Sequence, residues 1–291
     1  MKDEIFDYYH DAGKIAAKIL QRSAREIRIG GSYLDLVESI EVQVKDEGAE
    51  LAFPLNLSLN EDAAHDTASA GDARVFAKGD VAKLDLGVHI DGYIADTATT
   101  IDLGNNSLLI EASEQALDAA IKAVRPGATA GEIGAAIQLE IECRGYRPIS
   151  NLTGHGLDQY ILHRSPTIPN VGINGGVVLE EGMVFAIEPF ATTGSGHVGE
   201  KNRKEIYSHV SHKPVRVPAA RAILNKVMDR HGLPFARRWL DQKKLDITLS
   251  SLVRSQVLHV YPVLADIPGS LVSQHEHTVI VTSEGCIVTT R

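Results

Sequence analysis

The sequence has little cysteine and no concentrated positive charge. Its two cysteines, Cys143 and Cys286, stand far apart and form no Cys-x-x-Cys pair, which argues against a disulfide framework or a thiolate zinc site. The formal net charge is −9 and the basic clusters are short, so nothing indicates a wide cationic face for nucleic acid. A reducing, cytoplasmic setting is therefore expected.

Long apolar runs are missing as well. The segment from Met1 to Ile29 mixes charges with a helical period instead of placing an apolar block after a basic start, so we expect no signal peptide. No uncharged run approaches the roughly 20 residues that cross a bilayer, and we expect no membrane span. With 44% hydrophobic residues in 291, the chain suits one large α/β domain or two smaller ones.

Helical and β patterns divide the first half of the chain. Helical periods are found in residues 1–29, about 32–47, 107–124 and 129–143. The Pro- and Asn-containing stretch 53–72 is predicted to be a loop over a site, too polar and irregular for a core element. A strong hairpin signal follows, because the turn pair Asp91-Gly92 separates the β-patterned runs 81–90 and 93–101.

The second half is predicted to return to β structure around one long insertion. Residues 184–190 are typical of a buried strand broken by Pro189, and residues 272–281 and 286–290 of a closing hairpin. The segment 192–266 begins Gly/Ser-rich and then becomes helical, so we interpret it as an inserted helical subdomain. Its helices are expected at 218–231, 234–242 and 247–258.

The predicted hairpin places two carboxylates on one patch. If Asp91 and Gly92 form the turn, position 87 faces Asp96, so Asp85 lies diagonal to Asp96 on the same face of the sheet. Two like charges this close raise at least one carboxyl pKa unless a cation lies between them. The alternative is that one aspartate simply faces solvent.

Three further segments carry metal-ligand side chains. His155 lies between two glycines, which lets backbone pack closely around its ring. Glu188 lies inside an apolar strand, where an unpaired carboxylate is costly, and Glu276 lies between two histidines ahead of another apolar strand. Together with Asp85 and Asp96 they supply a charge that suits two divalent cations, and the ligand types favour Mn²⁺, Fe²⁺, Co²⁺ or Zn²⁺.

Four motifs in this order resemble the methionine aminopeptidase family: KLDLGVHIDGYIADTATT, GHGL, AIEPF and QHEHTV. The resemblance extends from AFPLNLSLNEDAAH at Ala52 to the C-terminus, and RRWL at Arg237, YPVLADIPGS at Tyr261 and the long insertion resemble the type 2 branch. Without a long charged N-terminal extension, the chain looks like the archaeal form. The resemblance implies an α+β pita-bread fold: one catalytic domain, 1–291, with a curved antiparallel sheet covered by helices and an insertion at 192–266.

Carried over by motif, the resemblance implies two divalent cations. Asp85 and Asp96 would bind one, while Asp96, His155, Glu188 and Glu276 would bind the other, with Asp96 and Glu276 bridging. A hydroxide between the metals would attack the carbonyl of the first residue, and Glu188 would shuttle its proton. The implied activity is removal of the initiator methionine from nascent polypeptides by a monomeric enzyme, with the ribosome as a candidate partner.

Two more histidines match family positions. His65 resembles the histidine that contacts the scissile amide nitrogen, and His163 the one that polarises the carbonyl or stabilises the oxyanion. Family members often read His-Tyr-Thr-Pro where this chain has His65, Asp66, Thr67 and Ala68. That departure puts the local loop shape in doubt.

An apolar pocket for methionine is expected by motif position. Its lining would be Phe53, Leu162 and Tyr261, with His163 nearby, although Phe53 and Leu162 also suit an ordinary core. His209, from the insertion, is a further candidate for the lining.

Three other functions fit parts of the sequence. An X-Pro peptidase of the same fold would carry a whole domain before the first metal ligand, and only 84 residues precede Asp85 here. A catalytically silent relative that binds ribosome or nucleic acid would be expected to have lost ligands. A purely structural calcium site would have no need of an imidazole such as His155.

Overall fold

A long antiparallel hairpin lies at the centre of the molecule. The computed structural model describes residues 1–291, and in it β4 (Val81–Ile90) pairs with β5 (Tyr93–Asp102) along their whole length. Asp91 and Gly92 have φ of 49° and 83°, as a two-residue hairpin turn requires. Gly87 faces Asp96, so the predicted register is confirmed.

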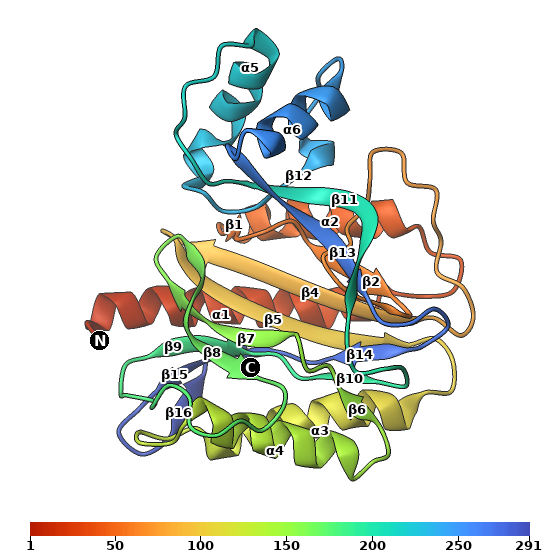
Figure 1. The fold of residues 1–291 in the computed structure, drawn as a ribbon. Coiled ribbons are helices and arrows are strands. Elements are labelled where there is room, and N and C mark those ends of the chain that lie inside the picture. Colours follow the sequence, from red (N-terminus) through yellow and green to blue (C-terminus); the bar gives the residue numbers. More distant parts are fainter.

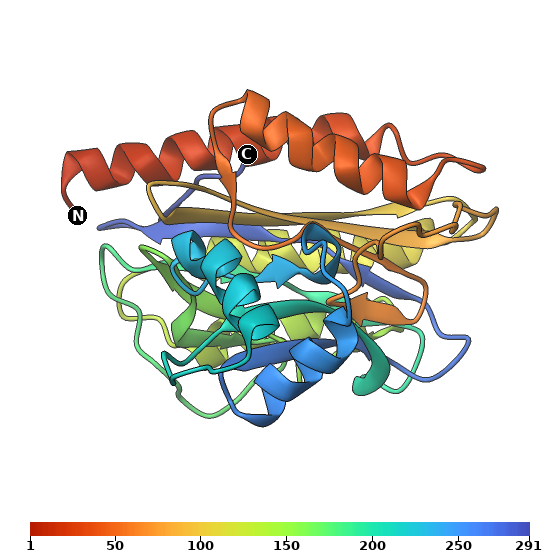
Figure 2. The same ribbon diagram turned by 90° about the horizontal axis from the view of Figure 1, so that it is seen from above.

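Two N-terminal helices cover one face of this hairpin. The helix α1 (Asp3–Ala24) buries Tyr9, Ala12, Ala16 and Ile19, a helical spacing that forms one apolar stripe. With α2 (Tyr33–Asp46) it packs on the sheet formed by β1 (Glu50–Leu51), β2 (Asn56–Leu59), β4 and β5. Figure 2 shows both helices along one side of the strands.

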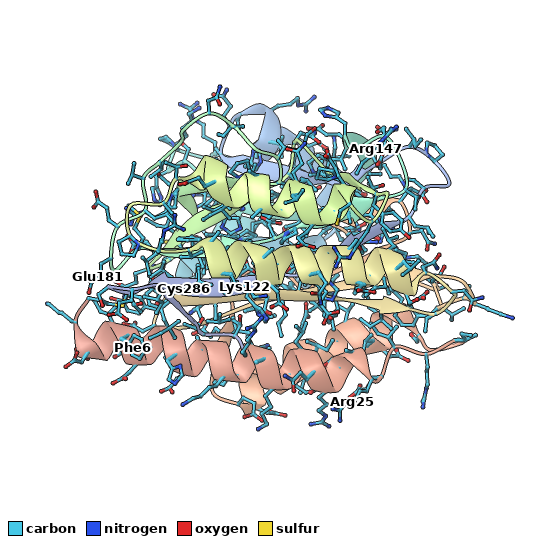
Figure 3. The ribbon with its side chains drawn as sticks, turned by 90° about the horizontal axis from the view of Figure 1, so that it is seen from below. Phe6, Arg25, Lys122, Arg147, Glu181 and Cys286 are labelled. Carbon is cyan, nitrogen blue, oxygen red and sulfur yellow. The ribbon has the colours of Figure 1, made fainter.

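Two more helices cover the second half of the molecule. The helix α3 (Ser107–Ala123) packs on α4 (Ala130–Glu142), which begins with the predicted capping box of Thr129 and Glu132. In the view from below they lie together, while Phe6 and Arg25 mark the two ends of α1 (Figure 3). The strands they cover are β6 (Arg147–Pro148), β7 (Thr153–Asp158), β8 (Ile161–Pro169), β9 (Val184–Ile187), β10 (Phe190–Thr192), β14 (Val272–Gln274), β15 (His277–Val281) and β16 (Cys286–Val288).

A pair of backbone hydrogen bonds joins the two halves. The Ala98 amide donates to the Glu276 carbonyl at 3.3 Å, and the Glu276 amide donates to the Ala98 carbonyl at 3.0 Å. The Thr278 hydroxyl adds a bond of 2.9 Å to the Asp96 carbonyl. All strand pairs are antiparallel, so the expected curved antiparallel sheet with helical cover is confirmed.

The segment 192–266 contains long strands as well as helices (Figure 1). β11 (Gly199–His209) pairs with β13 (Leu258–Ala265), which in turn pairs with β3 (Asp62–Ala64). α5 (Pro218–Val227) and α6 (Leu245–Arg254) pack on this ribbon around a small core of their own. None of the helices in the molecule is both long enough and apolar enough to span a membrane.

Two local predictions were wrong. The helix expected at 234–242 is absent, because β12 (Phe235–Ala236) pairs with Ile206 and Tyr207 of β11. One 3-10 turn, η2 (Arg237–Trp239), follows β12. A second 3-10 turn, η1 (Met228–Arg230), follows α5. The stretch 53–72 is also not only loop. β2 lies there with Leu57 buried and Leu59 half-buried against β4, since Leu55, Leu57 and Leu59 alternate with polar residues as a strand requires.

Candidate metal centre

One pocket opens on the face of the hairpin opposite to α1 and α2. Even-numbered Leu84 and Leu86 belong to the core beneath those helices, so the alternation of side chains turns Asp85 to the other face. Asp96 faces the same way from β5. The lining residues are Phe53, Asn56, Ala64, His65, Asp85, Asp96, His155, Leu162, His163, Glu188, Ile206, Pro234, Tyr261 and Glu276.

All five predicted metal ligands therefore meet in one place. His155 Nε2 lies 3.8 Å from Asp96 Oδ2 and 3.7 Å from Glu188 Oε1. Ligand atoms of Asp96, His155 and Glu276 lie within 4.8 Å of one another. Glu276 reaches the pocket because its backbone is bonded to Ala98, at the seam of the two halves.

The carboxylates repel one another strongly in this setting. Burial raises the pKa of Asp85 to about 7. Burial first, and then the charge of Asp85, raises the pKa of Asp96 well above its usual value. The pKa values of Glu188 and Glu276 are raised by burial and by the charges of Asp85 and Asp96.

Little in the protein offsets this repulsion. The amide of Gln274 lies 3.5 Å from Asp85 Oδ2 and 3.3 Å from Glu276 Oε2. Asp85 Oδ1, Asp96 Oδ1 and His155 Nδ1 are buried without a hydrogen-bond partner. Because buried polar atoms are normally paired, this cluster fits bound divalent cations, which would take up the free lone pairs and the charge.

The imidazoles of the pocket are held neutral. Burial, together with the unfavourable interaction that a second positive charge would have with the neighbouring His163 ring, lowers the pKa of His155 to about 3. Burial also lowers the pKa of His163, and burial together with the charge of His163 lowers the pKa of His65 to about 4. A neutral imidazole has a free lone pair for a metal or one N–H to donate, so these rings are suited to both tasks.

His163 and His65 both line the pocket and contact different neighbours. The His163 ring is centred 4.3 Å from that of His155. His65 Nδ1 lies 3.3 Å from the Pro262 carbonyl oxygen, and its ring meets that of Tyr261 edge-on at 5.5 Å.

The apolar wall consists of Phe53, Leu162 and Tyr261, as expected, together with Ile206 and Pro234. The Tyr261 hydroxyl lies 3.3 Å from Ser208 Oγ, which fixes one edge of the wall.

His209 does not belong to this wall. It lines a separate surface hollow with His212 and His231, and Ile206, three residues earlier on β11, takes the place expected for it. The ring of His209 packs on His212, with centroids 4.8 Å apart.

Comparison with known proteins identifies the family. The family model for Metallopeptidase family M24 matches residues 7–283. The chain belongs to metallopeptidase family M24. The predicted resemblance is confirmed within it, and the chain is a metal-dependent hydrolase of the methionine aminopeptidase group.

Relatives in M24 match over the full length of the chain. It is 49% identical to a methionine aminopeptidase of Archaeoglobus fulgidus over 292 residues, covering 100% of each chain. It is 47% identical to a methionine aminopeptidase of Pyrococcus horikoshii, covering 96% of this chain and 97% of the relative.

Solved structures of lower identity share the M24 fold. A methionine aminopeptidase from Thermotoga maritima has a TM-score of 0.75 at 24% identity, covering 100% of this chain and 98% of that one. A thermophilic Arx1 has a TM-score of 0.89 at 20% identity, covering 99% and 91%. These likenesses concern the fold alone.

Four residues in or beside this M24 pocket, namely Asn56, Ile206 and Pro234 of the lining and Gln274 next to it, were not anticipated from the sequence. Asn56 and Gln274 place amide groups beside Asp85, where they lower its pKa against the effect of burial. Ile206 and Pro234 come from the insertion, and only tertiary pairing brings them to the pocket. Asn56 had a usable signal, because the alternation of Leu55, Leu57 and Leu59 indicates a strand; in the structure this strand pairs with β4 and places Asn56 directly opposite Asp85.

Proposed function

We propose that the chain hydrolyses the first peptide bond of polypeptides that begin with methionine, with two divalent cations bound by Asp85, Asp96, His155, Glu188 and Glu276. The observation that supports this most directly is the convergence of four carboxylates and one neutral imidazole, with no basic side chain among them. Four negative charges match two M²⁺ ions better than one.

The ligand roles follow the family resemblance of the motifs. Asp85 and Asp96 would hold one ion, Asp96, His155, Glu188 and Glu276 would hold the other, and Asp96 and Glu276 would be shared by both. Oxygen ligands with one nitrogen suit Co²⁺, Mn²⁺, Fe²⁺ or Zn²⁺. When bound, two such ions lower the pKa of a water molecule so that it can attack a carbonyl at neutral pH.

The surrounding residues supply proton transfer and orientation. Glu188 has a raised pKa and a carboxylate oxygen 3.7 Å from His155 Nε2, which suits it to accept a proton and return it to the leaving amine. His163 donates a hydrogen bond to the substrate carbonyl oxygen, and His65 contacts the scissile nitrogen.

Substrate choice follows from the two walls of the pocket. Phe53, Leu162, Ile206, Pro234 and Tyr261 form an apolar wall that accepts an unbranched apolar side chain such as that of methionine. The opposite carboxylates attract a free α-amine, which restricts hydrolysis to the first residue.

The enzyme is proposed to act as a monomer of one domain, 1–291, with 192–266 as an inserted subdomain. The five proposed ligands and the apolar wall are already brought together within a single chain, which supports this proposal. Nascent chains are the source of N-terminal methionine, which makes the ribosome a candidate partner.

The deciding experiment is release of free methionine from a Met-Ala-Ser peptide. Metal-stripped protein should be inactive, and Co²⁺, Mn²⁺, Fe²⁺ or Zn²⁺ restored in turn should recover activity. The N-acetylated peptide should not be cleaved. Absence of release with every metal would overturn the proposal and favour a catalytically silent binding protein on the same fold.

A further inference from the structure

The loop that carries His65 is held in an unusual backbone conformation. His65 has φ of 64°, in the left-handed region that non-glycine residues seldom occupy. Such a conformation persists only where surrounding contacts impose it. The contacts that hold this loop therefore determine where the imidazole lies.

Asp66, the next residue, is fully buried and bound by two arginines. Arg74 Nη1 lies 2.5 Å from Asp66 Oδ2, and Arg203 Nε lies 2.7 Å from Asp66 Oδ1. The Tyr33 hydroxyl is 3.3 Å from the same carboxylate. Asp66 stands where family members often have the tyrosine of His-Tyr-Thr-Pro. This difference from the family pattern places a carboxylate at the centre of an ion network.

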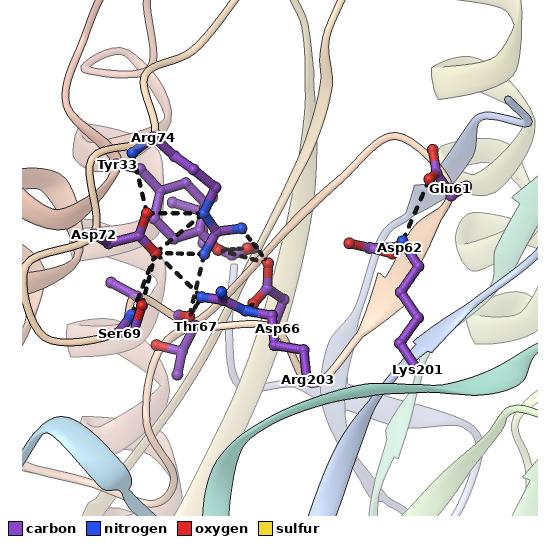
Figure 4. A network of polar contacts seen from close by, with 12 residues as sticks. Tyr33, Glu61, Asp62, Asp66, Thr67, Ser69, Asp72, Arg74, Lys201 and Arg203 are labelled. Carbon is purple, nitrogen blue, oxygen red and sulfur yellow. Dashed lines mark hydrogen bonds and ion pairs between the residues drawn. The ribbon is translucent and has the colours of Figure 1, made fainter. Parts of the chain in front are cut away.

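A second carboxylate closes the network. Asp72 Oδ2 accepts from Arg74 Nη2 at 2.7 Å and from Arg203 Nη2 at 3.1 Å. Figure 4 shows the two guanidinium groups between the carboxylates, with Arg203 reaching in from β11. Arg203 Nη2 also donates to the Thr67 carbonyl at 2.9 Å.

A second arginine of the insertion holds the other side of the loop. Arg238 Nη1 donates to Thr67 Oγ1 at 3.1 Å and to the Ala68 carbonyl at 3.2 Å. Its other nitrogen is paired with Glu41 of α2, which also accepts from Trp239 Nε1 at 3.0 Å. Arg238 is thereby fixed between α2 and the loop.

Strand β13 adds backbone support at His65 itself. It pairs with β3 immediately before the histidine, with Leu264 opposite Ala64. The Pro262 carbonyl faces His65 Nδ1 at 3.3 Å. Each of these supports, β11, η2 and β13, belongs to the segment 192–266.

We propose that the insertion serves as a clamp that positions His65, with Arg203 and Arg238 as the positioning residues. This rests on the role proposed above for His65 in the reaction. The clamp joins the insertion, α2 and the loop in one polar network. It adds to the contacts that the loop makes outside the insertion, where Arg74 binds Asp66 and the Leu57 amide donates to the Asp66 carbonyl at 2.8 Å. The arginines of the insertion do not contact Asp85 or Asp96. Metal binding and positioning of His65 are then separable properties.

The test compares Arg203→Met and Arg203→Lys with Arg237→Met. Arg237 is the matched control, because it is the neighbour of Arg238 and pairs with Asp246 inside the insertion, at 2.6 Å. Steady-state kinetics on Met-Ala-Ser, Co²⁺ titration by calorimetry and hydrogen exchange of the 60–72 amides are measured on each full-length protein.

Arg203→Met should lower kcat about 10- to 100-fold with KM and Co²⁺ affinity within about twofold of wild type, and should speed exchange of the 64–69 amides. Arg203→Lys should recover part of kcat, because an ammonium makes one of the three contacts. Arg237→Met should match wild type. Unchanged kcat and exchange in Arg203→Met would overturn the clamp.

Two further variants keep the result interpretable. Thr67→Val removes only the hydroxyl that Arg238 contacts and preserves volume, so it should lower kcat in the same direction even if Arg203→Met does not fold; full activity of Thr67→Val counts against the clamp. If His65→Ala is as active as wild type, the role of His65 is wrong. If His65→Ala is inactive while Arg203→Met and Thr67→Val are normal, only the clamp is wrong.

Discussion

Glu188 follows directly after the apolar strand β9, between Ile187 and Pro189, so the strand predicted over 184–190 is interrupted there before β10 begins. Its side chain is only 15% exposed, and burial with the charges of Asp85 and Asp96 raises its pKa. A group with this environment holds a proton more readily than a free glutamate does. Burying this carboxylate costs free energy, and the proposed roles of Glu188 in metal binding and proton transfer explain its position.

The first prediction concerns that proton. Glu188→Gln keeps the volume and removes the titratable oxygen, so kcat should fall roughly 10²- to 10⁴-fold while the fold is retained. Turnover of Met-Ala-Ser with saturating Co²⁺ and the far-ultraviolet circular dichroism spectrum measure the two effects. Turnover equal to that of wild type would remove Glu188 from the reaction.

Gly87 is a second single residue on which the pocket depends, because its position leaves no room for a side chain. A Cβ at this position would lie 2.1 Å from Cε1 of Phe53, so only glycine lets the Phe53 ring rest on β4. Gly87→Ala should displace the ring and lower kcat/KM for Met-Ala-Ser roughly 10-fold. Gly199→Ala, where a Cβ meets nothing within 4 Å, is the control and should keep wild-type kcat/KM. Equal values for both variants would show that Phe53 does not form the wall.

Among the elements, the hairpin was predictable and β11 was not. Asp91-Gly92 between alternating runs is a local signal, and it also set the register that places Asp85 beside Asp96. β11 reads Gly-Glu-Lys-Asn-Arg-Lys-Glu in its first seven residues, with no apolar alternation. Side chains of β11 form ion pairs such as that of Lys201 with Asp62. These pairs join segments that are distant in the sequence.

The ion network between elements gives a prediction about pH. Burial alone would raise the pKa of Asp72, but hydrogen bonds from the Arg74 side chain and backbone outweigh it and hold that pKa well below its usual value. A carboxyl with a depressed folded-state pKa stabilises the fold above its unfolded pKa, near 3.9. That stabilisation is lost as pH falls through the folded pKa.

The stability that Asp72 contributes to metal-free protein should therefore be lost between about pH 5 and pH 2, so the difference in free energy of unfolding between wild type and Asp72→Asn should shrink over that range. Urea titrations at several pH values measure it. Asp11→Asn, whose Lys14 partner is 3.9 Å away on an exposed helix face, should follow the wild-type curve. Parallel curves for wild type and Asp72→Asn would contradict the assignment.

At the scale of the whole molecule, the sequence predicted the convergence of the candidate ligands better than the architecture around them. Asp85, Asp96, His155, Glu188 and Glu276 each stand in a short motif, so their convergence could be inferred. The seam between the halves, the ribbon of β11 and β13, and the contribution of Ile206 depend on long-range pairing. No local pattern encodes such pairing, which is why His209 was proposed where Ile206 lies.

The metal centre should control the stability of the whole fold. Without cations the pocket carboxylates repel, so saturating Mn²⁺ at about 100 times its Kd should raise Tm by roughly 5–10 °C. Glu276→Gln should raise the Tm of metal-free protein and reduce the gain from Mn²⁺, whereas the exposed Glu114→Gln should do neither. Differential scanning calorimetry checks this, and a Tm indifferent to Mn²⁺ would argue against a metal site here.

The seam between Ala98 and Glu276 also has a consequence for synthesis. The five proposed ligands occur at positions 85, 96, 155, 188 and 276, and the last of them becomes available only when β15 docks beside β5. During vectorial translation the first four ligands leave the ribosome long before the fifth. A growing copy of this chain is therefore inactive until its final hairpin has emerged. It cannot remove methionine from the nascent chains around it before its own synthesis is nearly complete.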